Sequence, residues 1–105
     1  MRLKNVQAQV EKVLTERPES RDNDNILYLE IIKNIGRKTG VDVEKMSVAE
    51  LFTNMYRYKF PPMESVRRAR QKLQEKFPHL RSSEETQLFR EMNEEEYLEY
   101  VRRKY

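Results

Sequence analysis

The sequence predicts an all-α fold, with about five helices in a single domain that spans residues 1–105. Apolar residues recur three and four positions apart along most of the chain, which is the spacing of an amphipathic helix. Signals for strands are almost absent, because Val41-Asp42-Val43 is the only alternating β-branched stretch and is too short to build a sheet. The length of 105 residues suits one domain.

The first two predicted helices carry much of the apolar content. The first covers residues 2–16 with one apolar stripe, and a proline ends it. In the polar turn that follows, Asp22 or Ser20 is expected to cap the second helix. That helix is apolar nearly all round, so we expect it to be the central buried helix, ended by Gly36 or Gly40 in the left-handed conformation. The two apolar sets are Leu3, Val6, Val10, Val13 and Leu14, and Ile26, Leu27, Leu29, Ile31, Ile32 and Ile35.

The third and fourth predicted helices are separated by a short turn. Ser47 with Glu50 three residues later has the spacing of a capping box, so a helix begins there and must stop before Pro61. The fourth helix covers residues 63–76, and Pro78 ends it. The residues expected to face inward are Leu51, Phe52, Met55 and Tyr56 on the third helix, and Met63, Val66, Ala69 or Arg70, Leu73 and Phe77 on the fourth.

The last predicted helix is acidic and covers residues 83–104. Ser82-Ser83-Glu84-Glu85 has the spacing of a second capping box, and glutamates suit the positive N-terminal end of a helix. Its apolar stripe consists of Phe89, Met92, Tyr97, Tyr100 and Val101. We expect this helix either to pack on the core or to form the seam of a homodimer.

The charges of the chain are separated along its length. The formal net charge is only +3. Residues 1–56 have a net charge of zero, residues 57–81 of +6, residues 82–101 of −6 and residues 102–104 of +3. A basic segment therefore precedes an acidic one, and a basic segment of this kind favours contact with a polyanion.

Composition excludes several classes of site. The absence of cysteine excludes disulfides, cysteine zinc sites and thiol catalysis, and His79 is a single histidine, which we interpret as a loop residue rather than a general base. No apolar run approaches the ~20 residues that span a bilayer, and no secretory signal is visible, so we expect a cytoplasmic protein with no membrane contact. No Ser/His/Asp set, glycine-rich phosphate loop or metal cluster is visible, so we expect no enzyme, metal or cofactor.

Two acidic stretches have alternative interpretations. Asp22-Asn23-Asp24-Asn25 begins like a calcium loop, but Leu27 and Lys33 occupy the sixth and twelfth places, which need Gly and Glu, so helix capping is favoured. Glu94-Glu95-Glu96 face different sides of a helix and cannot converge on one ion. We interpret them as a solvated face, with an acidic partner-binding or DNA-mimicking surface as the alternative.

Residues 47–77 have the outline of a helix-turn-helix, in which a short helix and a turn precede a helix with a basic outer face. If Val66, Ala69 and Leu73 are buried, the outward residues are Ser65, Arg67, Arg68, Gln71, Lys72 and Gln74. Arginine suits guanine, glutamine suits adenine, and lysine meets phosphate. A solvated charged face is one alternative interpretation, and a basic face that docks on an acidic protein or on the glutamate-rich fifth helix is the other. In the same way, Tyr56 and Tyr58 either lie in the core or stack on nucleic acid.

Two resemblances bear on function. The pattern Ser-Val-x-Arg-Ala-x-x-x-Leu at residues 65–73 resembles the recognition helix of winged-helix and related transcription regulators, and residues 48–52 resemble their supporting helix; this resemblance covers residues 47–81, without strands for a wing. Residues 17–24, Leu27-Tyr28 and residues 64–76 resemble small, largely uncharacterised proteins encoded by phages and prophages of Gram-positive bacteria. The second resemblance implies a phage protein in the host cytoplasm.

The favoured function is DNA binding in phage transcriptional or replicative control. In this hypothesis the residues that enter the groove are Arg67, Arg68, Gln71 and Lys72, and those that bind phosphates are Arg57, Lys59 and Arg81. The alternative is a protein–protein effector that binds and modulates a host protein through its acidic and basic surfaces.

Overall fold

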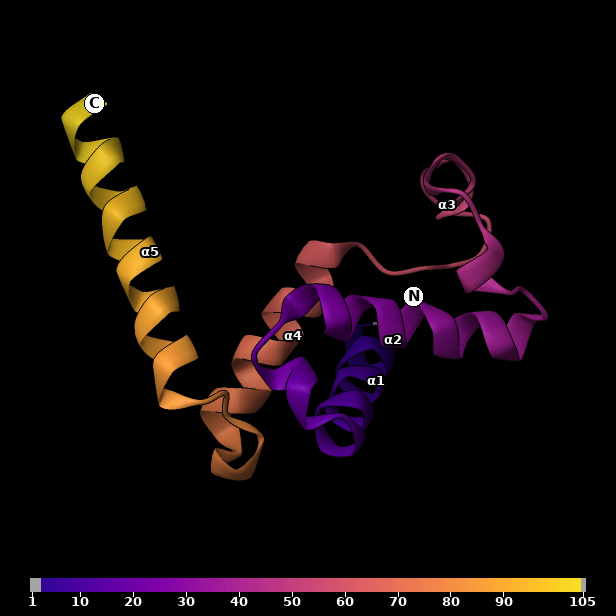
Figure 1. Ribbon diagram of the computed structural model, residues 1–105, viewed down its shortest axis with the longest axis horizontal. Helices are drawn as coiled ribbons and strands as arrows, with labels where there is room; N and C mark the ends of the chain where they lie inside the picture. The colour runs from indigo at the N-terminus through magenta and orange to yellow at the C-terminus, as the bar shows by residue number, and fades with distance from the viewer. Residues whose placement is uncertain (1–2, 105) are drawn as a thin grey trace.

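The computed structural model describes residues 3–104, and it confirms an all-α fold with no strand among those residues (Figure 1). The five α-helices are α1 (Leu3–Glu16), α2 (Asp24–Thr39), α3 (Val48–Asn54), α4 (Met63–Lys76) and α5 (Glu84–Lys104). Short 3-10 turns cover Pro18–Arg21, Val43–Lys45 and Pro78–Leu80. The first, second and fourth α-helices pack together, and α3 and α5 lie outside this three-helix core.

The core forms where the stripes of α1, α2 and α4 meet, and α1 packs mainly against α4. The main buried apolar residues are Val6, Val10, Val13 and Leu14 of α1, Leu27, Tyr28, Ile31, Ile32 and Ile35 of α2, and Val66, Ala69 and Leu73 of α4. The apolar side of α2 is therefore buried as predicted, but Leu29 is 45% exposed. The central helix is α1 rather than α2, because α1 packs against both of the other core helices. The side chain of Leu3 lies outside the described ones.

The ends of α2 and α3 depend on particular side chains. Asn23, rather than Asp22 or Ser20, caps α2, because its side-chain oxygen accepts hydrogen bonds from two backbone amides of the first turn. Gly40 ends the helix at φ 76°, where a side chain would be strained. Ser47 caps α3 as expected, since its hydroxyl accepts a hydrogen bond from the amide of Glu50 at 3.1 Å.

The third helix does not face the core as predicted. It has no fully buried residue; Leu51 and Met55 pack against the core, but Phe52 and Tyr56 are exposed. The reason is the eight-residue segment from Met55 to Pro62, which carries α3 away from the start of α4 (Figure 1). The hydroxyl of Tyr28 donates a hydrogen bond to the carbonyl of Pro61 at 2.8 Å and so holds the segment against α2.

The fifth helix projects from the core (Figure 1). Ser83 caps it, because the amide of Thr86 donates to the hydroxyl of Ser83 at 3.3 Å. Phe89 and Met92, which were expected to form a buried stripe, are exposed, because only the first turns of α5 reach the core. The side chains of Tyr97, Tyr100 and Val101 lie outside the described ones. Within residues 3–104, no helix combines the length and the apolar character that crossing a membrane requires.

Candidate nucleic-acid interface

The inner side of α4 is held by both apolar and charged contacts. Val66, Ala69 and Leu73 are buried as predicted, and Arg70 is buried beside them with 4% exposure. The Nε atom of Arg70 lies 2.6 Å from Oδ1 of Asp24, and its Nη2 donates to Oδ2 at 3.2 Å. The ion pair with Asp24, in which the Nη2 contact is a hydrogen bond, compensates the buried charge, so Arg70 is able to lie in the core.

Gln74 was expected to point outward, and this prediction is wrong. Its side chain is buried, and its Nε2 donates to the carbonyls of Arg21 and Leu80 at 3.1 Å each. Its Oε1 accepts a hydrogen bond from Arg70 at 3.0 Å. The 3-10 turns Pro18–Arg21 and Pro78–Leu80 bring backbone carbonyls next to this position, and a buried carbonyl needs a donor.

The outward side of α4 is exposed. Arg68, Gln71 and Lys72 are exposed, and the side chain of Arg68 has 71% exposure. Arg67 is half-buried and is held by Glu64, to which its Nη2 and Nε donate at 2.6 and 3.0 Å. Arg68 also donates to Glu64, at 3.2 Å. The hydrogen bond from Arg67 is the main reason why the pKa of Glu64 is lowered, so this carboxylate stays ionised at neutral pH.

The other three predicted site residues divide into two places. Arg81 lies just beyond the end of α4, and its Nε donates to the carbonyl of Gln74 at 3.1 Å. Arg57 and Lys59 are exposed in the turn after α3, where the guanidinium of Arg57 lies 5.9 Å from the ring of Tyr58 and Lys59 adopts φ 58°. Arg81 and Gln71 line the same groove, whereas the turn after α3 that carries Arg57 and Lys59 lies on a separate projection of the chain (Figure 1).

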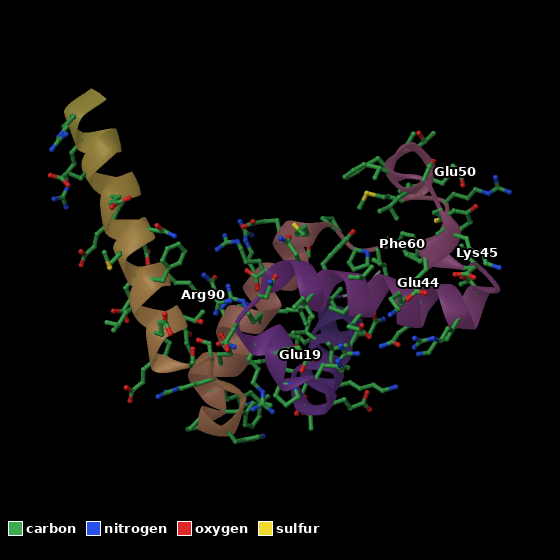
Figure 2. The ribbon with its side chains drawn as sticks, viewed as in Figure 1. Glu19, Glu44, Lys45, Glu50, Phe60 and Arg90 are labelled. Carbon is green, nitrogen blue, oxygen red and sulfur yellow. The ribbon has the colours of Figure 1, made fainter. Side chains whose placement is uncertain are left out.

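A polar groove lies between α4 and the start of α5, and sequence reasoning did not anticipate it. It has a volume of about 310 Å³, and its lining includes Arg70, Gln71, Gln74, Arg81, Gln87 and Arg90. Figure 2 shows Arg90 between α5 and the core, where its Nη1 donates to the carbonyl of Arg21 at 3.2 Å. Burial and the nearby charge of Arg70 lower the pKa of Arg90. One feature of the sequence pointed to Arg90, because it is the single basic residue in residues 82–101, which also contain seven glutamates.

The acidic helix does not pack along the outward side of α4, although its charge reaches that side. The pKa of Arg67 is raised mainly by its hydrogen bond to Glu64 and to a smaller extent by the charge of Glu94 on α5. Among the described residues, α5 has no extensive contact with another helix, and it diverges from α4 in Figure 1. The groove at its base contacts the edge of α4 that carries Gln71 and Gln74. The described part of the chain also contains no cluster of three or more His, Asp or Glu side chains able to hold a metal ion.

Comparisons with known proteins identified no relative of this chain. No protein-family model matches the sequence, and neither a curated protein nor a solved structure matches the chain.

Proposed function

We propose that the protein binds DNA through the outward side of α4, which we call the α4 basic face and define by Arg67, Arg68, Gln71 and Lys72. The observation that carries this proposal is the exposure of Arg68 on a helix that α5 leaves uncovered. A helix whose inner side is held in the core presents its outer side in one orientation, which contact with a DNA groove requires.

The members of the α4 basic face have different roles in this proposal. Arg68 and Lys72 carry the charges that meet the polyanion, and Gln71 between them supplies an amide for a base edge. Arg68 shares Glu64 with Arg67 in an exposed ion pair. Such a pair contributes little free energy, so DNA is able to displace Arg68 from Glu64.

The remaining cations extend the proposed surface. Arg81 continues it beyond the end of α4 as a phosphate contact, and Arg57 and Lys59 offer a second phosphate contact from the turn after α3. The resemblance to phage-encoded proteins supports placing this binding in transcriptional or replicative control in the host cytoplasm. In this proposal the protein acts by binding alone and has no catalytic role.

The test is fluorescence anisotropy with a labelled 30-base-pair duplex between about 50 and 200 mM salt. Affinity should fall steeply with salt, and Arg68→Ala with Lys72→Ala should weaken binding and reduce the slope of log K against log salt by about 1 for each lost phosphate contact. Arg37→Ala with Lys38→Ala is the charge-matched control, because it removes two exposed cations from α2. This control should retain most of the affinity.

Three results would contradict the proposal. The first is no binding at about 50 mM salt. The second is an equal loss in the α4 pair and the α2 control, which would indicate a general charge effect. The third is a stoichiometric host protein captured by a chain with no DNA affinity, which would favour the effector function instead.

A further inference from the structure

Two apolar patches are left without cover in this chain. The α3 patch consists of Val48, Phe52 and Tyr56, which are 70%, 67% and 97% exposed. The α5 patch consists of Leu88, Phe89 and Met92, which are 58–63% exposed. Single exposed apolar residues are ordinary, but groups of large ones mark interaction surfaces.

Each patch lies on one side of its element. Val48 and Phe52 are four residues apart on α3, and Tyr56 follows at the same interval in the turn. On α5, Leu88 and Met92 are four residues apart with Phe89 beside them. Helices in proteins gain most of their stability from packing of their apolar residues, and the exposed group on α5 makes no such contact within the described chain.

The charges around the two patches are complementary. Residues 48–59, which contain the α3 patch, carry Arg57, Lys59 and Glu50, for a net charge of +1. Residues 88–99, which contain the α5 patch, carry five glutamates and Arg90, for a net charge of −4. The two patches therefore match each other in apolar character and in charge, which favours their association.

The arrangement of the helices makes a reciprocal contact between two copies feasible. In Figure 1, α3 and α5 rise on the same side of the three-helix core, at opposite ends of a molecule whose longest dimension is 46 Å. A two-fold axis between the projections would place α5 of each copy beside α3 of the other. Such a contact uses both patches twice and closes at two copies.

We propose that the protein forms a symmetric dimer in which the α5 patch of each copy packs on the α3 patch of the other. Six apolar side chains from each copy are covered in this arrangement. Glu95 and Glu96 then lie near Arg57 and Lys59 of the second copy. Pairing α5 with α5 through Leu88, Phe89 and Met92 would instead bring two glutamate-rich segments together, which like-charge repulsion disfavours.

The first test is the mass of the full chain by sedimentation equilibrium at about 100 µM protein, a concentration that reveals a dimer of micromolar Kd. The wild-type protein should have twice the monomer mass of 12.8 kDa. Phe52→Ser and Phe89→Ser should each shift it to the monomer, whereas Leu29→Ser, which alters an exposed leucine of α2, should remain dimeric. All three positions are exposed, and circular dichroism checks that each variant keeps its helices.

The second test reverses charges. Arg57→Glu with Lys59→Glu, or Glu95→Lys with Glu96→Lys, should each weaken dimerisation about tenfold or more, because like charges then face each other. All four changes in one chain should restore it.

Three results overturn the dimer. The first is a wild-type protein with the mass of a monomer. The second is a Phe52→Ser variant that stays dimeric while Phe89→Ser becomes monomeric. The third is a variant with all four charge reversals that dimerises as weakly as the two double variants. Sedimentation measures the mass in the absence of DNA, and Phe52, Phe89, Glu95 and Glu96 lie outside the proposed DNA-binding surface, so failure of the dimer is distinguishable from failure of DNA binding. Arg57 and Lys59 are also proposed phosphate contacts, so their charge-reversal variants are judged by mass alone.

Discussion

Arg70 shows how one buried contact sets the orientation of α4. The helical period places both Ala69 and Arg70 near the inner side, and the structure buries both. The carboxylate of Asp24 makes this possible, because it pairs with the guanidinium over a separation of 46 residues. Arg67 and Arg68 lack such a buried partner and remain available on the outer side.

Asp24→Ala should therefore destabilise the protein strongly. The substitution leaves the charge of Arg70 buried without its partner, and we expect the free energy of unfolding to fall by about 3 kcal/mol, the low end for a broken buried ion pair, since Asp24 is partly exposed. Urea denaturation measures this loss. Glu64→Ala is the control, because it removes a carboxylate from two arginines in solvent and should change stability little. Equal losses in the two variants would contradict the role assigned to Asp24.

The N-terminus of α2 shows that the choice of a capping residue depends on more than local sequence. Within Asp22-Asn23-Asp24, each side chain is able to cap a helix, so local propensity does not choose among them. The structure uses Asn23 for α2, and Asp22 accepts a hydrogen bond from the amide of Ser83 at 2.7 Å. The prediction that Asp22 or Ser20 caps α2 was therefore wrong. Asp22 instead contacts Ser83 at the start of α5, and the hydroxyl of Ser20 donates to the carbonyl of Arg17.

Asp22→Ala should loosen α5 without loosening α2. The substitution removes the acceptor that holds Ser83 at the start of the helix, and we expect a local loss of about 1 kcal/mol there. Hydrogen exchange followed by mass spectrometry should show faster exchange over residues 84–90 and unchanged exchange in α2. Asp42→Ala, an exposed aspartate in the loop after α2, should leave both segments unchanged. Equally faster exchange in α2 would show that Asp22 stabilises the whole core instead.

At the scale of the whole molecule, ion pairs at the surface make stability depend on pH. The pKa of Glu19 is lowered by a hydrogen bond from the backbone amide of Glu19 and by another from the side chain of Arg17. The hydrogen bond from Lys33 lowers the pKa of Glu44, and that from Arg67 lowers the pKa of Glu64. A carboxylate with a lowered folded-state pKa stabilises the fold above its unfolded pKa, near 4.5, and this stability is lost as the pH falls through the lower folded value.

The melting temperature should therefore fall as the pH is lowered from about 6 to about 3, across the ordinary range of a glutamate pKa. Scanning calorimetry measures the change. A variant with Glu19→Gln, Glu44→Gln and Glu64→Gln should fall less over the same range, because it lacks the three titrating groups. Two results would contradict the assignment of this pH dependence to the three glutamates. The first is a wild-type Tm that rises on acidification, and the second is a triple variant whose Tm falls with pH as steeply as that of the wild type.

The sequence by itself determined the five helices, much of their shared core and the charge pattern of α4, because helical period, caps and prolines act over a few residues. Only the tertiary structure decided that Gln74 lies inside and that Phe52 and Phe89 lie outside. A given helical stripe is compatible with burial or with exposure, and the outcome depends on where distant segments lie. Here the segment between α3 and α4 carries α3 outward. The hydrogen bonds of Ser83 and Arg90 hold only the first turns of α5 at the core, and the rest of the helix projects away. The same geometry leaves the α4 basic face uncovered and presents the two apolar patches to a second copy.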